Sequence, residues 1–171
     1  MALTTMALRI GIDIGGTKTD AVALDASGAV AAERRLATGF GAAAVLDSAE
    51  TAVRALATQL GVSPAEFATI GVGIPGAVDR ITGRVAHAVN LGLEDLDLGG
   101  ELAARLGRPV RVENDVNAAA LGAWQALGGG SSDSMAYLNL GTGLAAGLVL
   151  GGRLWRGARG VAGEIGHIPV D

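Results

Sequence analysis

Three short stretches of this chain contain polar residues or glycines that could transfer a proton or bind phosphate. Asp115 follows Asn114 directly before a segment rich in small residues, and Glu164 and His167 share one short turn. Asp13 precedes a glycine pair. A carboxylate can accept a proton from a hydroxyl group, and the backbone N–H groups of a glycine bend can bind phosphate oxygens. The three stretches therefore predict proton transfer and phosphate binding.

The first stretch lies where a predicted strand meets a predicted helix. Residues 109–112 form an apolar and basic run typical of a short buried strand, and residues 116–127 have the composition of a close-packed helix. α/β folds bind ligands at the carboxyl ends of their strands, so Asp115 is expected beside a ligand. A structural interpretation stays open, because Asn114 or Asp115 could simply cap the helix by accepting a backbone N–H.

The stretch with Asp13 and the glycine pair lies between two predicted strands, residues 8–14 and 19–24. No helix follows Gly15 and Gly16, so the pair is not a dinucleotide-binding fingerprint but a bend between antiparallel strands. We expect the N–H groups of this bend and the Thr17 hydroxyl to face phosphate oxygens, with Asp13 holding the accompanying cation. A plain hairpin turn is the alternative.

A similar strand, glycine bend and strand recur in residues 135–150, with Gly141-Thr142-Gly143 at the bend. The glycine- and serine-rich segment 128–134 precedes them and is the one linker-like stretch of the chain. This repetition predicts a duplicated architecture with one phosphate-facing bend in each lobe. We therefore predict an N-terminal lobe over residues 1–127 and the start of a second lobe over residues 128–171.

The remaining scaffold follows from apolar spacing and predicts a compact α/β protein. Residues 42–60 have helical periodicity and end at Gly61, and residues 98–106 form a short amphipathic helix. Residues 69–74 form the continuous apolar run expected of a central strand, and residues 85–90 are expected to be extended.

The composition excludes several classes of partner. The 171 residues carry a net charge of −4 without a basic tract, which argues against nucleic-acid binding. No apolar run reaches the roughly 18 residues needed to cross a membrane, and the N-terminus does not resemble a signal peptide. The absence of cysteine removes disulfides and thiolate metal sites and predicts a reducing, cytoplasmic location.

Four motifs in a fixed order resemble those of the ROK family (repressors, open reading frames and kinases), within the actin-like ATPase and sugar kinase superfamily. They are the first phosphate motif at 13–18, the catalytic segment at 113–122, the second phosphate motif at 140–143 and the sugar-binding Glu-x-Gly-His at 164–167. The resemblance runs from about Arg9 to the last residue. It implies an actin-like ATPase (ribonuclease H-like) fold, with a mixed sheet flanked by helices and the beginning of a second similar lobe.

The resemblance also implies an activity, namely ATP-dependent phosphorylation of a hexose or N-acetylhexosamine hydroxyl with Mg²⁺ as cofactor. Asp115 would be the general base. The family's sugar-binding roles carry over to Asn90, Asn114, Asp115, Glu164 and His167. Its phosphate and Mg²⁺ roles carry over to Asp13, Gly15, Gly16, Thr17, Lys18, Gly141, Thr142 and Gly143. Lys18, the only lysine of the chain, is expected only to order its bend.

Family kinases are much longer than this chain, so the resemblance implies truncation after the Glu-x-Gly-His motif, weak nucleotide binding by the chain alone and a homodimer in the full-length form. In the family, the histidine at position 167 binds zinc together with three downstream cysteines, so this chain alone builds no such site. Two alternatives stay open: a non-catalytic sugar-binding or dimerisation fragment, and a sugar-responsive transcriptional regulator of the repressor branch. The sequence leaves the identity of the sugar open.

Overall fold

The computed structural model of this chain describes residues 8–141, 143–158 and 160–168. The chain divides into two compact units, residues 1–113 and residues 114–171. Within the described ranges, no helix combines the length and the apolar character needed to cross a membrane.

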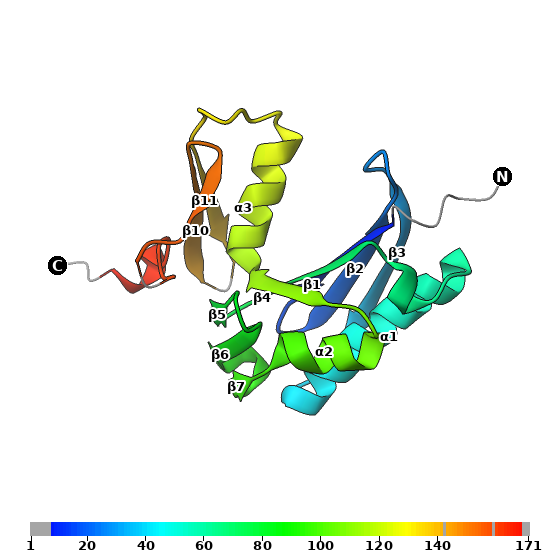
Figure 1. The fold of residues 1–171 in the computed structure, drawn as a ribbon. Coiled ribbons are helices and arrows are strands. Elements are labelled where there is room, and N and C mark those ends of the chain that lie inside the picture. Colours follow the sequence, from blue (N-terminus) through cyan, green and yellow to red (C-terminus); the bar gives the residue numbers. More distant parts are fainter. Residues whose placement is uncertain (1–7, 142, 159, 169–171) are drawn as a thin grey trace. The chain divides into compact units, whose positions relative to one another are not determined.

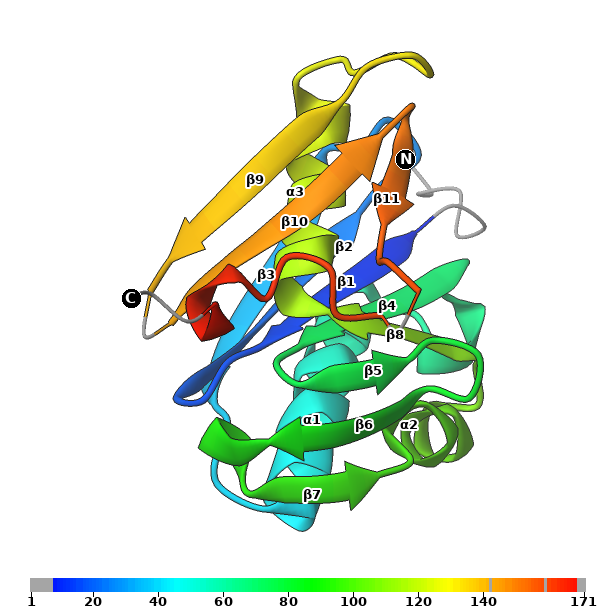
Figure 2. The same cartoon turned by 90° about the vertical axis from the view of Figure 1, so that its left-hand side faces the viewer.

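The first unit is built on a five-stranded sheet, and its mixed strand directions agree with the mixed sheet that the family resemblance implies. Its strands are β1 (Arg9–Ile14), β2 (Lys18–Leu24), β3 (Val30–Ala37), β4 (Thr69–Ile74) and β8 (Val110–Asn114). They lie in the order β3-β2-β1-β4-β8 (Figures 1 and 2). β1 pairs antiparallel with β2 and parallel with β4, and β2 pairs antiparallel with β3. β4 therefore lies inside the sheet, which explains its continuous apolar sequence.

Helix α1 (Ala42–Leu60) packs on this sheet, with α2 (Leu98–Leu106) beside it (Figure 1). The buried side chains of α1 recur at helical spacing and share one apolar core with the isoleucines of β1: Val45, Leu46, Ala49, Val53, Leu56, Ile10, Ile12 and Ile14. Gly61 ends α1 in the left-handed conformation, with φ 69°. A 3₁₀ turn, η2 (Pro64–Glu66), follows with a capping box between Ser63 and Glu66. Both helices are as predicted from the sequence.

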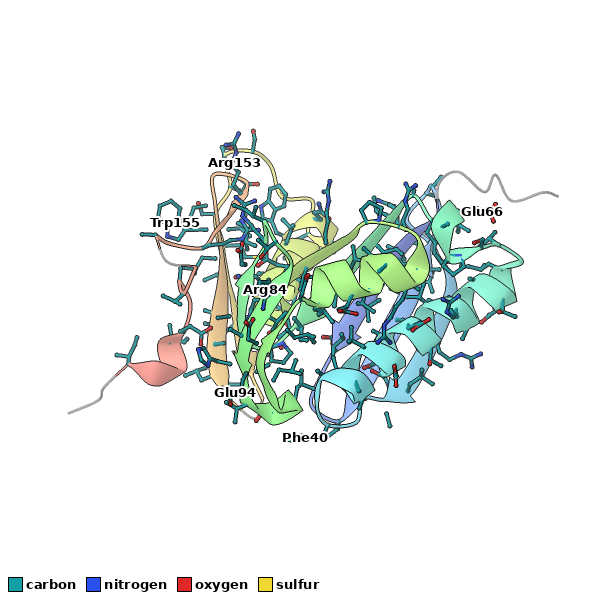
Figure 3. The ribbon with its side chains drawn as sticks, turned by 60° about the horizontal axis from the view of Figure 1, so that its bottom comes forward. Phe40, Glu66, Arg84, Glu94, Arg153 and Trp155 are labelled. Atoms are coloured by element: carbon teal, nitrogen blue, oxygen red, sulfur yellow. The ribbon has the colours of Figure 1, made fainter. Side chains whose placement is uncertain are left out.

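A second, three-stranded sheet in this unit was not predicted. It consists of β5 (Ala77–Asp79), β6 (Arg84–Ala88) and β7 (Leu93–Leu96), with the 3₁₀ turn η3 (Val89–Leu91) between the last two (Figure 2). The sequence indicated only an extended segment, because the charged centre of β7 breaks the apolar pattern and the strand depends on pairing with β6. Arg84 and Asp95 form an ion pair at 2.6 Å between these strands, and Figure 3 labels Arg84 and Glu94 on this sheet.

The second unit packs helix α3 (Asp115–Ala126) on an antiparallel sheet. The strands are β9 (Met135–Leu140), β10 (Leu144–Leu150) and β11 (Arg153–Trp155), in the order β11-β10-β9 (Figure 2). A Cβ on Gly147 would lie 2.4 Å from the Ala120 Cβ and 2.8 Å from the Val116 carbonyl oxygen. Only glycine at this position of β10 lets the helix approach so closely.

The opposite face of this sheet carries exposed apolar side chains. Along β9 half-buried residues alternate with exposed ones, and Tyr137 of the half-buried series pairs with Gly147, which faces α3. The exposed series therefore lies on the other face and includes Leu138 and Leu140, 61% and 80% exposed. Trp155 of β11, labelled in Figure 3, is also exposed. In the described residues the sheet thus has one face packed on α3 and one apolar face open.

Candidate functional site

The bend predicted between β1 and β2 is confirmed. Gly15, Gly16 and Thr17 connect the two strands, and the Gly15 N–H donates to the Lys18 carbonyl at 2.8 Å across the turn. Gly16 and Thr17 are exposed. Within the described part of the chain, the N–H groups of Gly16 and Thr17 and the Thr17 hydroxyl donate to no protein acceptor. Such donors on an exposed bend suit the binding of anionic oxygens.

Asp13 lies one residue before the end of β1, with an exposed side chain. Its cross-strand partner is Asp20, whose charge is balanced by Arg35 and by Lys18 at 3.8 Å. A carboxylate beside a bend with such donors fits Mg²⁺, which is usually held by one or two carboxylates together with phosphate oxygens. No group of three His, Cys, Asp or Glu side chains able to hold a metal occurs among the described residues. The Lys18 side chain pairs with Asp20 of the same strand, whereas the Lys18 carbonyl accepts the Gly15 N–H of the bend.

Asn90, a predicted sugar ligand, lies in η3 next to this bend. A Cβ placed on Gly16 would lie 3.5 Å from both the Cβ and the carbonyl oxygen of Asn90, and Asn90 is exposed. The Gly41 N–H donates to the Leu91 carbonyl at 2.8 Å and fixes the turn that carries Asn90. The first unit therefore brings the bend and one candidate sugar ligand together.

Thr38 contacts the same bend and was missed by the sequence prediction. It follows β3 and is 1% exposed. Its hydroxyl donates to the Gly15 carbonyl at 2.7 Å, and its N–H donates to the Thr17 carbonyl at 3.2 Å. No sequence signal marks this residue, because a threonine beside a glycine is an ordinary turn pattern.

In the second unit, Asn114 is both the last residue of β8 and the N-cap of α3. Its side-chain oxygen accepts the N–H groups of Val116 at 3.1 Å and of Asn117 at 3.2 Å. The capping interpretation is therefore correct for Asn114, whereas Asp115 is the first residue of the helix. With the oxygen in the cap, a sugar hydroxyl bound by Asn114 would accept a hydrogen bond from its NH₂ group.

Asp115 is half-buried, and its carboxyl group accepts the N–H of Val116 at 2.9 Å. Burial raises the pKa of Asp115, because removal from water disfavours the charged form. Backbone hydrogen bonds oppose this shift, and the negative charge of Glu164 adds to it. A carboxylate with a raised pKa is a stronger base than an ordinary aspartate, which suits proton abstraction.

The segment that carries Glu164 runs beside β10. The Ala146 N–H donates to the Gly163 carbonyl at 2.7 Å, and a Cβ on Gly163 would lie 1.7 Å from the Ala146 carbonyl oxygen. Gly163 also has φ 96°, so this close contact requires glycine. The contact places Glu164 within electrostatic reach of Asp115. The second unit therefore brings two of the predicted site residues together.

The second glycine bend and His167 are described in part. The Gly141 N–H donates to the Gly143 carbonyl at 2.9 Å between the ends of β9 and β10, which confirms the predicted strand, bend and strand. Thr142 lies outside the described residues. For His167 only the backbone is described, and it lies in the 3₁₀ turn η4 (Ile165–His167).

Comparison with known proteins connects these features to one family. The sequence model of the ROK family matches residues 9–171. The glucokinase of Streptomyces coelicolor is 38% identical over 163 residues, which are 95% of this chain and 50% of that enzyme. The xylose repressor of Caldicellulosiruptor bescii is 37% identical over 110 residues, which are 64% of this chain and 27% of the repressor.

Among solved structures, a ROK family glucokinase from Streptomyces griseus in complex with glucose and AMPPNP is 37% identical and has a TM-score of 0.84. The similarity covers 96% of this chain and 51% of that chain, so this chain spans about half the length of the glucokinases that it matches. It confirms the actin-like α/β fold predicted from the sequence. The chain belongs to the ROK family.

Proposed function

We propose that this chain is part of an ATP-dependent sugar kinase, which phosphorylates a hydroxyl group of a hexose or N-acetylhexosamine. The glucokinases among its relatives support this activity, and one of them holds glucose and AMPPNP in its structure. The observation that carries the proposal is the environment of Asp115. It is a half-buried carboxylate at the start of α3, and burial raises its pKa.

Asp115 acts as the general base of this reaction. Its carboxylate accepts the proton of the sugar hydroxyl while that oxygen attacks the γ-phosphorus of ATP. The bond from the γ-phosphorus to the bridging oxygen breaks, and ADP leaves with the bonding electron pair. Because phosphoryl transfer needs little covalent help from the protein, most of the rate comes from positioning and charge stabilisation.

The other hydroxyl groups of the sugar are bound by polar side chains. A buried sugar hydroxyl without a hydrogen-bond partner costs about 1–3 kcal/mol, so a sugar site must present several donors and acceptors. We assign this role to Asn90, Asn114, Glu164 and His167. Asn114 has two tasks in this scheme, because its oxygen caps α3 while its NH₂ group donates to the sugar.

The two glycine bends hold the phosphate groups of ATP. In the first bend, the exposed N–H groups of Gly16 and Thr17 donate to phosphate oxygens, and the second bend, at Gly141-Thr142-Gly143, has the corresponding role. Asp13 would hold Mg²⁺, which neutralises phosphate charge when it is bound. Lys18 helps to order the first bend through its carbonyl, which accepts the Gly15 N–H, and its exposed ion pair with Asp20 contributes little.

The activity is tested with the product of the complete reading frame that encodes this chain. This protein is incubated with MgATP and, in turn, glucose, fructose, mannose, N-acetylglucosamine or N-acetylmannosamine, and phosphorus NMR follows the products. We expect ADP and a sugar monophosphate in equal amounts with at least one sugar. Formation of no sugar phosphate from any of these sugars would contradict the proposal.

The xylose repressor among the relatives favours a second candidate, a regulator that binds a sugar without phosphorylating it. Calorimetry with the same sugars separates the two functions. A regulator would bind one of these sugars and leave ATP unchanged, whereas a kinase consumes ATP in proportion to the sugar.

A further inference from the structure

A cluster of three buried hydroxyl groups contacts the bend between β1 and β2 through one of its members, Thr38. They belong to Thr19 of β2, to Thr38 after β3 and to Ser48 of α1, and these residues are 0%, 1% and 8% exposed. The Thr19 hydroxyl lies 2.9 Å from that of Thr38 and 3.2 Å from that of Ser48. A polar cluster this deep in an apolar core is retained only where its hydrogen bonds are satisfied.

The direction of the hydrogen bonds follows from counting protons, because each hydroxyl has only one to donate. The Thr38 proton goes to the Gly15 carbonyl at 2.7 Å, so the proton between Thr19 and Thr38 belongs to Thr19. The Ser48 proton goes either to Thr19 or to the Val45 carbonyl at 3.0 Å. Thr19 therefore donates to Thr38 and Thr38 donates to the Gly15 carbonyl, and the first of these bonds strengthens the second.

This hydrogen bond fixes the orientation of one peptide group of the bend. In a trans peptide the N–H points opposite to the C=O, and the described residues contain no cis peptide. Because the Gly15 carbonyl points toward the buried Thr38 hydroxyl, the Gly16 N–H points away from it, on the side where Gly16 is exposed. Glycine on both sides would otherwise let this peptide rotate easily.

The loop that contains Thr38 also contacts the Asn90 turn. The Thr38 N–H donates a hydrogen bond to the Thr17 carbonyl at 3.2 Å. Three residues later, the Gly41 N–H donates one to the Leu91 carbonyl at 2.8 Å. One short loop between β3 and α1 therefore fixes both the glycine bend and the turn that carries Asn90.

We propose that Thr38 is a positioning residue for nucleotide binding: its buried hydroxyl holds the Gly15–Gly16 peptide so that the Gly16 N–H donates to a phosphate oxygen of ATP. This inference rests on the proposed kinase function and adds to it a residue outside the family motifs. Because Thr38 is only 1% exposed, it acts through the bend and not by direct contact with a ligand. Loss of its hydroxyl frees the peptide to rotate and weakens phosphate binding without removing a phosphate ligand.

The test is an NMR titration of the complete gene product with MgATP, read at the Gly16 amide resonance. The variants are Thr38→Val, which removes the hydroxyl at nearly constant volume, Thr38→Ser, which keeps it, and Ser48→Ala, which removes a hydroxyl that does not contact the bend. We expect Thr38→Val to weaken the MgATP affinity about 5- to 10-fold, as loss of one hydrogen bond would. Thr38→Ser and Ser48→Ala should stay close to the parent chain.

The parent chain supplies a second readout that does not depend on the folding of any variant. Its Gly16 amide should shift with MgATP far more than the amide of Gly28, an exposed glycine in the turn between β2 and β3. Equal shifts of Gly16 and Gly28 would overturn the inference. Unchanged MgATP affinity in a folded Thr38→Val variant, or an equal loss in Thr38→Ser, would also overturn it.

The kinase assay with the complete gene product keeps the two proposals distinguishable. Sugar phosphate formation together with an unresponsive Gly16 amide would refute the role of Thr38 and leave the kinase function intact. A responsive Gly16 amide that is lost in Thr38→Val, without sugar phosphate formation, would refute the kinase function and retain the role of Thr38 in phosphate binding.

Discussion

Glu164 lies near enough to Asp115 for its negative charge to raise the pKa of Asp115, in addition to the larger effect of burial. The two residues come from different elements of the unit formed by residues 114–171, namely the start of α3 and the segment before η4. The tight contact of Gly163 with β10 fixes the Glu164 segment. The basicity of Asp115 is therefore set by tertiary structure, and it can be changed without altering Asp115 itself.

The first prediction concerns the pH dependence of kcat/KM in the complete gene product. The reaction needs Asp115 in its charged form, so kcat/KM should fall as the pH drops through the raised pKa of Asp115. Glu164→Gln removes the neighbouring negative charge, lowers this pKa and should move the acid limb of the profile to lower pH. Glu94→Gln, at an exposed position of β7, is the control and should leave the limb in place. An acid limb that stays fixed or moves upward in Glu164→Gln would contradict this electrostatic coupling.

The second prediction concerns stability, which Asp115→Asn should not reduce at neutral pH. Because the folded chain holds the Asp115 proton more tightly than the unfolded chain, the contribution of this group to stability is present at low pH. It is lost as the pH rises from the ordinary aspartate pKa of 3.8 through the raised pKa of the folded chain. At neutral pH the buried carboxylate therefore opposes folding, and a neutral amide removes this penalty.

Urea denaturation of the parent chain and of Asp115→Asn at neutral pH measures this difference in stability. We expect the variant to be at least as stable as the parent. At a pH below 3.8 the advantage should disappear, since both side chains are then neutral. A variant that is clearly less stable at neutral pH would show that the carboxylate charge stabilises the fold.

The third prediction separates the two tasks of Asn114, helix capping and sugar binding. Asn114→Ser keeps a capping oxygen but lacks the NH₂ group, so stability should change by only a few tenths of a kcal/mol while the KM for the sugar rises roughly 3- to 10-fold. Asn114→Ala removes both groups and should also cost about 1 kcal/mol of stability. Denaturation curves and steady-state kinetics measure the two effects. An unchanged sugar KM in Asn114→Ser would leave Asn114 as a cap only.

The fourth prediction concerns the close packing of α3 on β10. Gly147→Ala places a methyl group 2.4 Å from the Ala120 Cβ and 2.8 Å from the Val116 carbonyl oxygen, so the helix must shift. Overpacking of this kind costs about 1–3 kcal/mol. Gly122→Ala is the matched control, because nothing lies within 4 Å of its Cβ and alanine favours a helix by about 0.5–1 kcal/mol. Equal urea midpoints for the two variants would contradict the packing described for this helix.

Local patterns in the sequence were sufficient to predict most of the scaffold. Apolar spacing and a terminal glycine specify α1, and the two glycine bends follow from the alternation of strands and glycines around them. β5 and β7 could not be predicted, because β5 is very short and β7 has charged residues at its centre. Both depend on pairing with β6, which local sequence does not encode.

Part of the candidate site, like β5 and β7, could not be predicted from the sequence. Motifs identify Asp115, Glu164 and the glycine bends, and their roles remain predictions. Thr38 has no motif, because its significance comes from a hydrogen bond to a residue 23 positions earlier. The raised pKa of Asp115 likewise depends on burial and on a charge that folding brings close. The motifs indicate which residues could take part in chemistry, whereas contacts between distant segments are seen only in the structure.

The role of Asp115 as general base is best tested by the turnover of Asp115→Asn in the complete gene product, with sugar affinity measured by calorimetry on the same preparation. The asparagine keeps the size and hydrogen-bonding shape of the side chain but cannot accept the proton of the sugar hydroxyl. We predict that kcat falls about 10²- to 10⁴-fold while the variant still folds and binds the sugar. A folded Asp115→Asn variant with the turnover of the parent enzyme would contradict the assignment of Asp115 as the general base.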